Sequence, residues 1–192
     1  MRIRSVLYVL PAVAVAGLAL SAACSSQAKP LAAGATATSA TSNAAGGAVH
    51  LTDYTDNDGP TSTVFLSGAV GDYGTAQAVN PDGSVDPDHR HQLNLTLTHG
   101  SFRLDIADLA AKFTTRMASF AVNTTTCSGT ASVSAATPVV AGSGTGSYAG
   151  ISGTFDLTIT LDEVDKPTAC SVNSAYLAQL IVITGSGDVT FG

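Results

Sequence analysis

Apolar and polar residues alternate strictly along two stretches of the chain, and this period of two constrains the fold most. Every second residue of 92–98 (QLNLTLT) is Leu, and in 155–162 (FDLTITLD) Phe, Leu and Ile alternate with Asp and Thr. Successive side chains of a strand point to opposite faces, so each stretch has one apolar and one polar face. The pattern predicts an antiparallel sheet with one face buried and the other in solvent.

Other segments of the chain fit the same sheet, and one segment fits a helix. In 105–118 the apolar residues recur at three- and four-residue spacing, which predicts an amphipathic helix. Many short antiparallel strands with one helix predict a closed barrel or a sandwich, and a barrel leaves no exposed edge strand. The other strands are expected at 48–55, 61–70, 73–79, 102–106, 126–134, 176–184 and 187–191.

The N-terminal residues have the layout of a bacterial export signal. A short basic start precedes an apolar run from Val6 to Leu20 and small residues at 21–23, so 1–23 is interpreted as a signal peptide rather than a retained transmembrane helix. Cys24 follows directly and resembles the lipid-acceptor Cys of a bacterial lipoprotein. Cleavage after Ala28 by an ordinary signal peptidase is the alternative, and would give a secreted soluble protein.

An Ala-, Ser-, Thr- and Gly-rich segment follows Cys24. Residues 24–47 have no hydrophobic periodicity, and such a composition is typical of a flexible linker. The expected organisation is therefore a lipid-anchored linker at 24–47 and a β domain at 48–192. This chain would lie on the outer face of the bacterial cell membrane, held by lipid on Cys24.

The cysteine count fits that organisation. The chain has three Cys, and an odd number in an exported protein leaves one to explain. If Cys24 carries lipid, Cys127 and Cys170 remain to form a disulfide in an oxidising compartment. Two free buried thiols are the alternative.

The charge balance excludes one large class of partner. The chain carries 8 Lys and Arg against 14 Asp and Glu, a formal net charge of −6 at pH 7. Such a chain has no basic surface with which to neutralise phosphates, so it is not expected to bind nucleic acid.

Several glycine-containing motifs resemble known exported proteins. The run 144–155 (GTGSYAGISGTF) resembles the G-x-G-x-Y-x-G-x-x-G hairpin of dirigent and allene-oxide-cyclase-like barrels. With 71–74 (GDYG), 100–102 (GSF) and 126–129 (TCSG), it also makes 48–192 similar to a family of uncharacterised exported actinobacterial proteins. The resemblance implies a calycin-like barrel of eight strands and no particular activity.

Two acidic segments are candidate metal sites. Asp86, Asp88, His89 and His91 lie within six residues and offer mixed nitrogen and oxygen ligands for Zn²⁺ or another divalent ion. The segment follows a strong turn signal, so a solvated loop is the first alternative, and acid/base catalysis by these residues is the second.

The second segment has the composition of a calcium turn. Asp53, Asp56 and Asp58 would supply oxygen ligands. Aligning Gly59 with the loop glycine of an EF-hand places Tyr54 at the first ligand position, which excludes that motif. A plain Asp/Asn/Gly turn between two strands is the alternative.

The sequence offers little to support catalysis. It has no G-x-S-x-G elbow, and the acidic residues at 162–165 are interpreted as a solvated strand end. We therefore expect a non-catalytic barrel that binds a small apolar ligand, with no cofactor. The alternatives are a structural or interaction lipoprotein with a filled barrel, and an isomerase- or cyclase-like enzyme.

Overall fold

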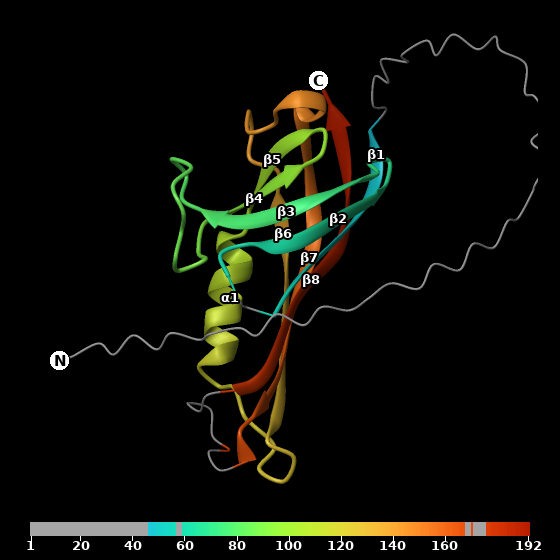
Figure 1. Cartoon of the computed structure of the whole chain (residues 1–192). Coiled ribbons are helices and arrows are strands. Elements are labelled where there is room, and N and C mark those ends of the chain that lie inside the picture. Colours follow the sequence, from blue (N-terminus) through green and yellow to red (C-terminus); the bar gives the residue numbers. More distant parts are fainter. Residues whose placement is uncertain (1–45, 57–58, 168–169, 171–175) are drawn as a thin grey trace, which may run out of the picture. The chain divides into compact units, whose positions relative to one another are not determined.

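The computed structural model has eight antiparallel strands in one sheet and one α-helix (Figure 1). The structure describes residues 46–56, 59–167, 170 and 176–192. The elements are β1 Gly47–Thr55, β2 Ser62–Gly68, β3 Asp72–Val79, β4 Gln92–Leu97, β5 Gly100–Asp105, α1 Ala107–Met117, β6 Ser128–Pro138, the short 3-10 helix η1 Gly146–Tyr148, β7 Ile151–Asp165 and β8 Tyr176–Phe191.

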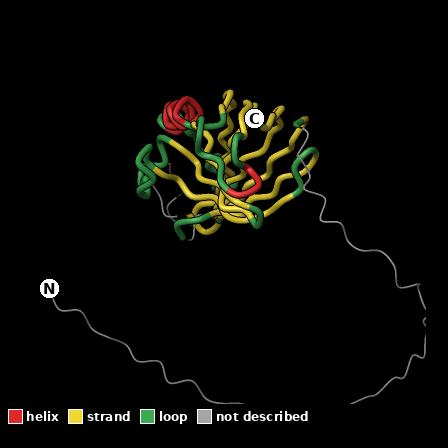
Figure 2. Tube along the Cα trace, turned by 90° about the horizontal axis from the view of Figure 1, so that it is seen from above, coloured by secondary structure: helices red, strands yellow, loops and turns green. Residues whose placement is uncertain are grey.

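The sheet curls into a half-barrel. Its strand order is β5-β4-β3-β2-β1-β8-β7-β6, so β5 and β6 are the two edges. Seen from above, the strands form an arc with α1 end-on beside it (Figure 2). The edges meet at one bridge between Leu104 and Val139, and the backbone N–H of Val140 donates to the Arg103 carbonyl at 2.8 Å. The rest of β6 packs against α1 instead of β5.

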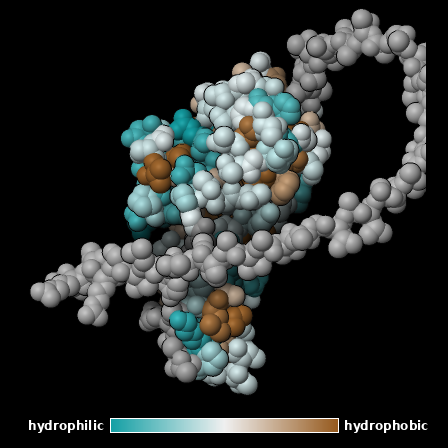
Figure 3. All heavy atoms as spheres, viewed as in Figure 1, coloured by the Kyte–Doolittle hydropathy of each residue, from teal (hydrophilic) through white to brown (hydrophobic). Residues whose placement is uncertain are grey.

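The strands sort their side chains by face, as the alternation predicts. Leu93, Leu95 and Leu97 of β4 are buried on the inner face, where they join the main apolar core. The outer face is rich in hydroxyls, and cross-strand pairs such as Ser134 and Thr158 hydrogen-bond there at 2.7 Å. The view in Figure 3 is mostly pale or teal, with smaller brown patches. One face of the curl is thus core and the other is solvated.

Most of the expected elements are confirmed, with two differences. The strands expected at 176–184 and 187–191 are one strand, because Gly185 and Gly187 do not break it. A Cβ at either position would collide with the backbone of β7, so these glycines allow two long strands to lie close. The closed barrel is not confirmed, because β5 and β6 pair only at the Leu104–Val139 bridge.

A second, smaller core lies along the long strands. Phe120, Ala131 and Leu161 are buried together there, with Phe113 and Met117 of α1 packed against them. The helix therefore has apolar contacts at both ends, and these fix its position across the curl.

Candidate functional site

A cavity of about 320 Å³ lies between α1 and the inner face of the sheet. Its walls are mainly aliphatic, and one aromatic ring, that of Phe113, faces it from the helix. The lining residues are Asp53, Thr55, Gly59, Pro60, Thr61, Ser62, Ala76, Gln77, Ala78, Asp88, His89, Leu93, Ile106, Leu109, Ala110, Phe113, Thr114, Ile159, Ile181 and Ile183.

The helix that covers the cavity is positioned by its first turn and its apolar stripe. The chain leaves β5 at Asp105, whose Oδ1 accepts a hydrogen bond from the Ala107 backbone N–H at 3.1 Å. Leu109 is then buried in the main core, and Phe113 follows one turn later. Residues at this spacing share one helix face, so α1 presents its apolar side to the sheet.

Asp53 is the buried carboxyl on the cavity wall. It lies on the inner face of β1, with Val64 and Ile183 as its cross-strand neighbours, and is 3% exposed. Its Oδ1 has no hydrogen-bond partner among the described residues. Burial raises the pKa of Asp53 to about 6, although hydrogen bonds from Ser62 and the Tyr54 backbone act to lower it. The site therefore holds a desolvated acid with an unused acceptor.

The other titratable groups that line the cavity come from one loop. Asp88 and His89 belong to the β3–β4 loop, and both are exposed at the cavity rim. Among the described lining residues none is Lys or Arg. The fixed charge around the cavity is therefore acidic.

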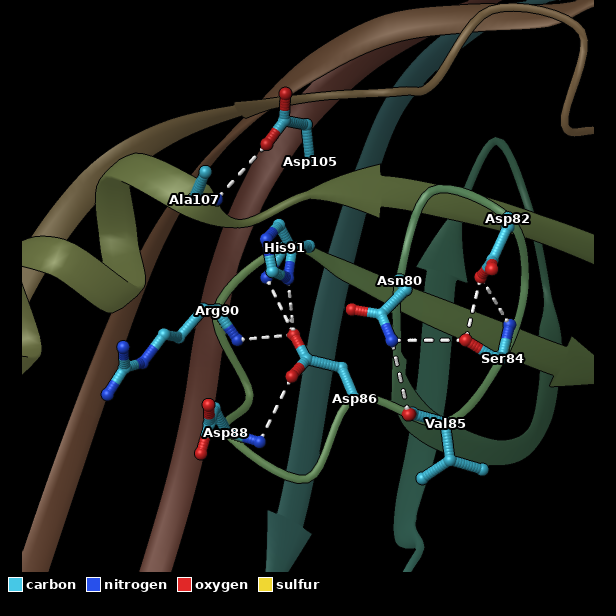
Figure 4. A network of polar contacts seen from close by, with 10 residues as sticks. All are labelled: Asn80, Asp82, Ser84, Val85, Asp86, Asp88, Arg90, His91, Asp105 and Ala107. Carbon is cyan, nitrogen blue, oxygen red and sulfur yellow. Dashed lines mark hydrogen bonds and ion pairs between the residues drawn. The ribbon is translucent and has the colours of Figure 1, made fainter.

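The predicted zinc segment forms a loop organised around Asp86 (Figure 4). The Asp86 carboxylate accepts the backbone N–H groups of Asp88 at 3.0 Å, Arg90 at 2.7 Å and His91 at 3.1 Å. The His91 ring nitrogen Nδ1 lies 2.8 Å from Asp86 Oδ2. Burial acts to raise the pKa of Asp86, but these hydrogen bonds outweigh it and lower the pKa to about 2.

Asp86 therefore stabilises the conformation of its own loop. His89, which has a positive φ of 54°, lies at the cavity instead. Within the described ranges, no three His, Cys, Asp or Glu side chains come together as metal ligands would.

The predicted calcium turn is divided by the fold. Asp53 lies inside β1 and faces the cavity, whereas Asp56 follows the end of that strand. Asp58 lies outside the described residues. The structure therefore assigns Asp53 to the cavity wall instead of the turn.

A second buried carboxylate, Asp72, lies at the end of the sheet near η1. It accepts hydrogen bonds from the Tyr73 backbone at 2.8 Å, from the backbone and hydroxyl of Thr98, from the His99 backbone at 3.1 Å and from the Tyr148 hydroxyl at 2.6 Å. Burial would raise the pKa of Asp72, but these donors outweigh it and hold the pKa well below its usual value. Burial and the nearby Asp72 together raise the pKa of Tyr148.

Asp72 and its donors from Tyr73, Thr98, His99 and Tyr148 form one cluster, the Asp72 hub. This hub joins three of the glycine motifs described above. Asp72 comes from 71–74, its partner Thr98 directly precedes the turn into 100–102, and Tyr148 belongs to 144–155. Gly146 has a positive φ of 58°, and a Cβ there would collide with the His99 carbonyl oxygen. The three motifs therefore meet around Asp72 at one end of the sheet, where they stabilise the fold.

The acidic strand end at 162–165 differs from its interpretation as solvated. Asp165 is 1% exposed, and neither of its carboxylate oxygens has a hydrogen-bond partner among the described residues. Glu163 lies on the same face of β7, and Gln179 donates to it at 2.9 Å. Burial, followed by the neighbouring Asp165, raises the pKa of Glu163. Two inward residues of one strand therefore bring their carboxyls together.

Cys127 and Cys170 lie at disulfide distance, with Cα atoms 5.1 Å apart. The Cys127 carbonyl accepts the Asp165 backbone N–H at 2.7 Å, which ties the pair to the end of β7. Cys24, the predicted signal peptide at 1–23 and the predicted linker as far as residue 45 lie outside the described residues.

Comparisons with known proteins give no relative for this chain. No protein-family model, curated protein or solved structure matches it. Among the described helices, none has the length and apolar character needed to cross a membrane. The site must therefore be interpreted from its own geometry.

Sequence reasoning missed the role of Asp53 and the existence of the Asp72 hub. A signal for Asp53 was present, because Val49, Leu51 and Asp53 alternate along 47–55 and share one face. The Asp72 hub left no such signal, since Tyr148 is 76 positions further along the chain.

Proposed function

We propose that this domain binds a small, mainly apolar ligand in the cavity under α1, with the curled sheet and helix acting together as a calycin-like barrel. The observation that carries the proposal is the aliphatic cavity of about 320 Å³. An apolar cavity of roughly 150 Å³ is enough to hold benzene, so this one suits a ligand of about twice that size. Such a cavity disfavours the alternative of a barrel filled by its own side chains.

A non-catalytic role fits the cavity better than an isomerase or cyclase activity. Such enzymes need several polar groups that converge on the reacting atoms. Here Asp53 is the buried titratable group on the wall, and Asp88 and His89 lie exposed at the rim. One buried acid in an aliphatic surround positions a ligand more readily than it transforms one.

From the sequence alone, we also propose that this binding domain lies at the cell surface. The signal segment and Cys24 would export the chain and attach it by lipid to the outer face of the membrane. Replacing Cys24 with Ser tests the anchor. The variant should leave the membrane fraction, and a variant that still partitions with membranes after signal cleavage would show that the anchor is not lipid on Cys24.

The binding proposal is tested by filling the cavity. Isothermal titration calorimetry with 2-naphthylmethanol should detect binding to the full chain. Ala110→Leu adds bulk at a cavity-lining position of α1 and should weaken that binding by about tenfold or more. Ala111→Leu makes the same change on the exposed side of the helix and should leave it unchanged. The proposal fails if the wild-type chain takes up no naphthylmethanol, or if Ala110→Leu binds as the wild type does.

A further inference from the structure

We propose that the cavity selects a ligand that carries one amine on an apolar body, with the ammonium group donating to Asp53. This inference rests on the proposed ligand-binding function and names the class of ligand. The observations that carry it are the unpartnered acceptor on the cavity wall, the apolar surface around it and the sign of the charge at the rim.

The first step is the unmet hydrogen bond of Asp53. The side chain is almost fully excluded from water, and Oδ1 has no donor among the described residues. A buried acceptor left unpaired destabilises the protein, and more so when it is charged. A ligand that brings an N–H donor into the cavity recovers that cost, whereas a pure hydrocarbon leaves it in place.

The second step is the charge of the cavity. Asp53 and Asp88 are the acidic lining residues, and His89 is the one lining residue in the described ranges that can become cationic. His89 is exposed at the rim, while Asp53 is on the wall. Within the part of the chain that the structure describes, no cationic side chain therefore pairs with the buried acid, and a ligand ammonium supplies the missing charge.

The third step is the apolar surround. Val64 and Ile183 flank Asp53 across the sheet, and Phe113 and Ile181 line the same cavity. A small inorganic cation would lose its hydration here without gaining enough ligands. An amine attached to a ring or short alkyl body gains apolar burial as well as the charge-assisted hydrogen bond.

The same arrangement disfavours anionic lipids. A carboxylate headgroup at Asp53 would place two acids together in an apolar site, and like charges at such a distance are strongly unfavourable. Fatty acids are therefore poor candidates, although their chains would suit the walls.

The test compares three ligands of one shape on the full chain. At pH 8, calorimetry should give the order 2-naphthylmethylamine, then 2-naphthylmethanol, then 2-naphthoate, with the amine about tenfold or more tighter than the alcohol. Asp53→Asn keeps the shape of the side chain and removes the charge, so the amine and the alcohol should then bind within about twofold of each other. Asp82→Asn, in the exposed β3–β4 loop and outside the cavity lining, should keep the wild-type order.

The outcomes separate this inference from the function on which it rests. If none of the three ligands binds, the ligand-binding function fails and the inference with it. If the alcohol binds but the amine binds no tighter, the cavity is a ligand site and the amine inference is overturned. The ligand order in the wild-type chain decides this even if Asp53→Asn does not fold.

Discussion

Asp53 and Asp72 are both buried aspartates of the same sheet, yet their surroundings are opposite. Asp72 is 7% exposed and Asp53 is 3% exposed. Asp72 has donors from three separate parts of the chain, whereas Asp53 keeps one oxygen without a partner among the described residues. As a result, the pKa of Asp72 is lowered and that of Asp53 is raised.

The difference separates an acid that stabilises the fold from an acid that can accept a hydrogen bond from a ligand. A carboxylate supplied with donors by its own fold stabilises that fold. A carboxylate that lacks a donor destabilises the fold whenever it is charged, and a ligand that supplies the donor removes that cost. Burial alone does not distinguish these roles, but the count of donors does.

The largest effect should come from removing Asp72. Asp72→Ala leaves the Tyr148 hydroxyl, the Thr98 hydroxyl and the His99 N–H without their carboxylate acceptor, so we expect a loss of about 4 kcal/mol in the free energy of unfolding. Urea unfolding at pH 7 measures it. Asp82→Ala, in an exposed turn, is the matched control and should cost less than about 1 kcal/mol. A loss from Asp72→Ala as small as the control's would show that the hub is not structural.

Replacing Asp53 should instead increase the free energy of unfolding at neutral pH. Its pKa in the fold is raised from 3.8 to about 6, so the fold binds a proton more tightly than the unfolded chain does. Through this group, stability is greatest at low pH and falls as pH rises from about 4 to 6, by up to about 3 kcal/mol. Asp53→Asn should therefore be more stable than the wild type at pH 7 and closely matched to it at pH 4.

Urea unfolding of both chains at pH 4, 5, 6 and 7 measures this difference. Subtracting the two curves removes the contribution of the other titrating groups, including Glu163. A constant difference across the pH range would contradict the raised pKa of Asp53.

Removing one donor from the hub should have an intermediate effect. Tyr148→Phe keeps the ring, which packs against Phe102 at a centroid distance of 5.3 Å, and removes only the hydroxyl that donates to Asp72. We expect a loss of about 1.5 kcal/mol in urea unfolding, smaller than that of Asp72→Ala because the other donors remain. Tyr73→Phe removes an exposed hydroxyl as a control and should be neutral. Equal losses from the two variants would indicate that the Tyr148 hydroxyl bond contributes nothing.

The smallest effect should come from removing a donor from Asp53. The Ser62 hydroxyl lowers the pKa of this acid against the effect of burial. Ser62→Ala should therefore raise that pKa further and move the stability loss to higher pH, with a change of less than about 1 kcal/mol at pH 7. The pH at which the Asp53 carboxyl titrates, followed by its ¹³C chemical shift, gives the answer directly. A titration that moves to lower pH would reverse the role assigned to Ser62.

The two acids also mark how far the sequence could predict this molecule. Alternation in 92–98 and 155–162 is a local pattern, so the strands and the helix at 105–118 were predictable. Asp53 was assigned to a turn because a polar residue on the inner face interrupts the apolar pattern just before an Asp- and Gly-rich segment. The cavity was not predictable, because its volume depends on how α1 and six strands pack.

Two errors have the same physical origin. The acidic end of β7 was interpreted as solvated, but Asp165 is buried, since tertiary packing rather than residue type decides which strand end is covered. The partners of Asp72 lie 26 and 76 positions along the chain, and no local pattern links them. Whether the sheet closes as a barrel, and whether Cys24 carries lipid, remain predictions.

The strand order has a consequence for how the chain reaches this structure. β1 pairs with β8 in the middle of the sheet, with Gly47 opposite Val189, so the first and last strands meet. Such pairing closes a very long loop, which slows folding. Until the 16 residues of β8 are available, β1 and β7 each keep an unpaired edge, the kind of edge on which β-proteins aggregate. The chain is therefore most vulnerable during synthesis, before its last strand has been made.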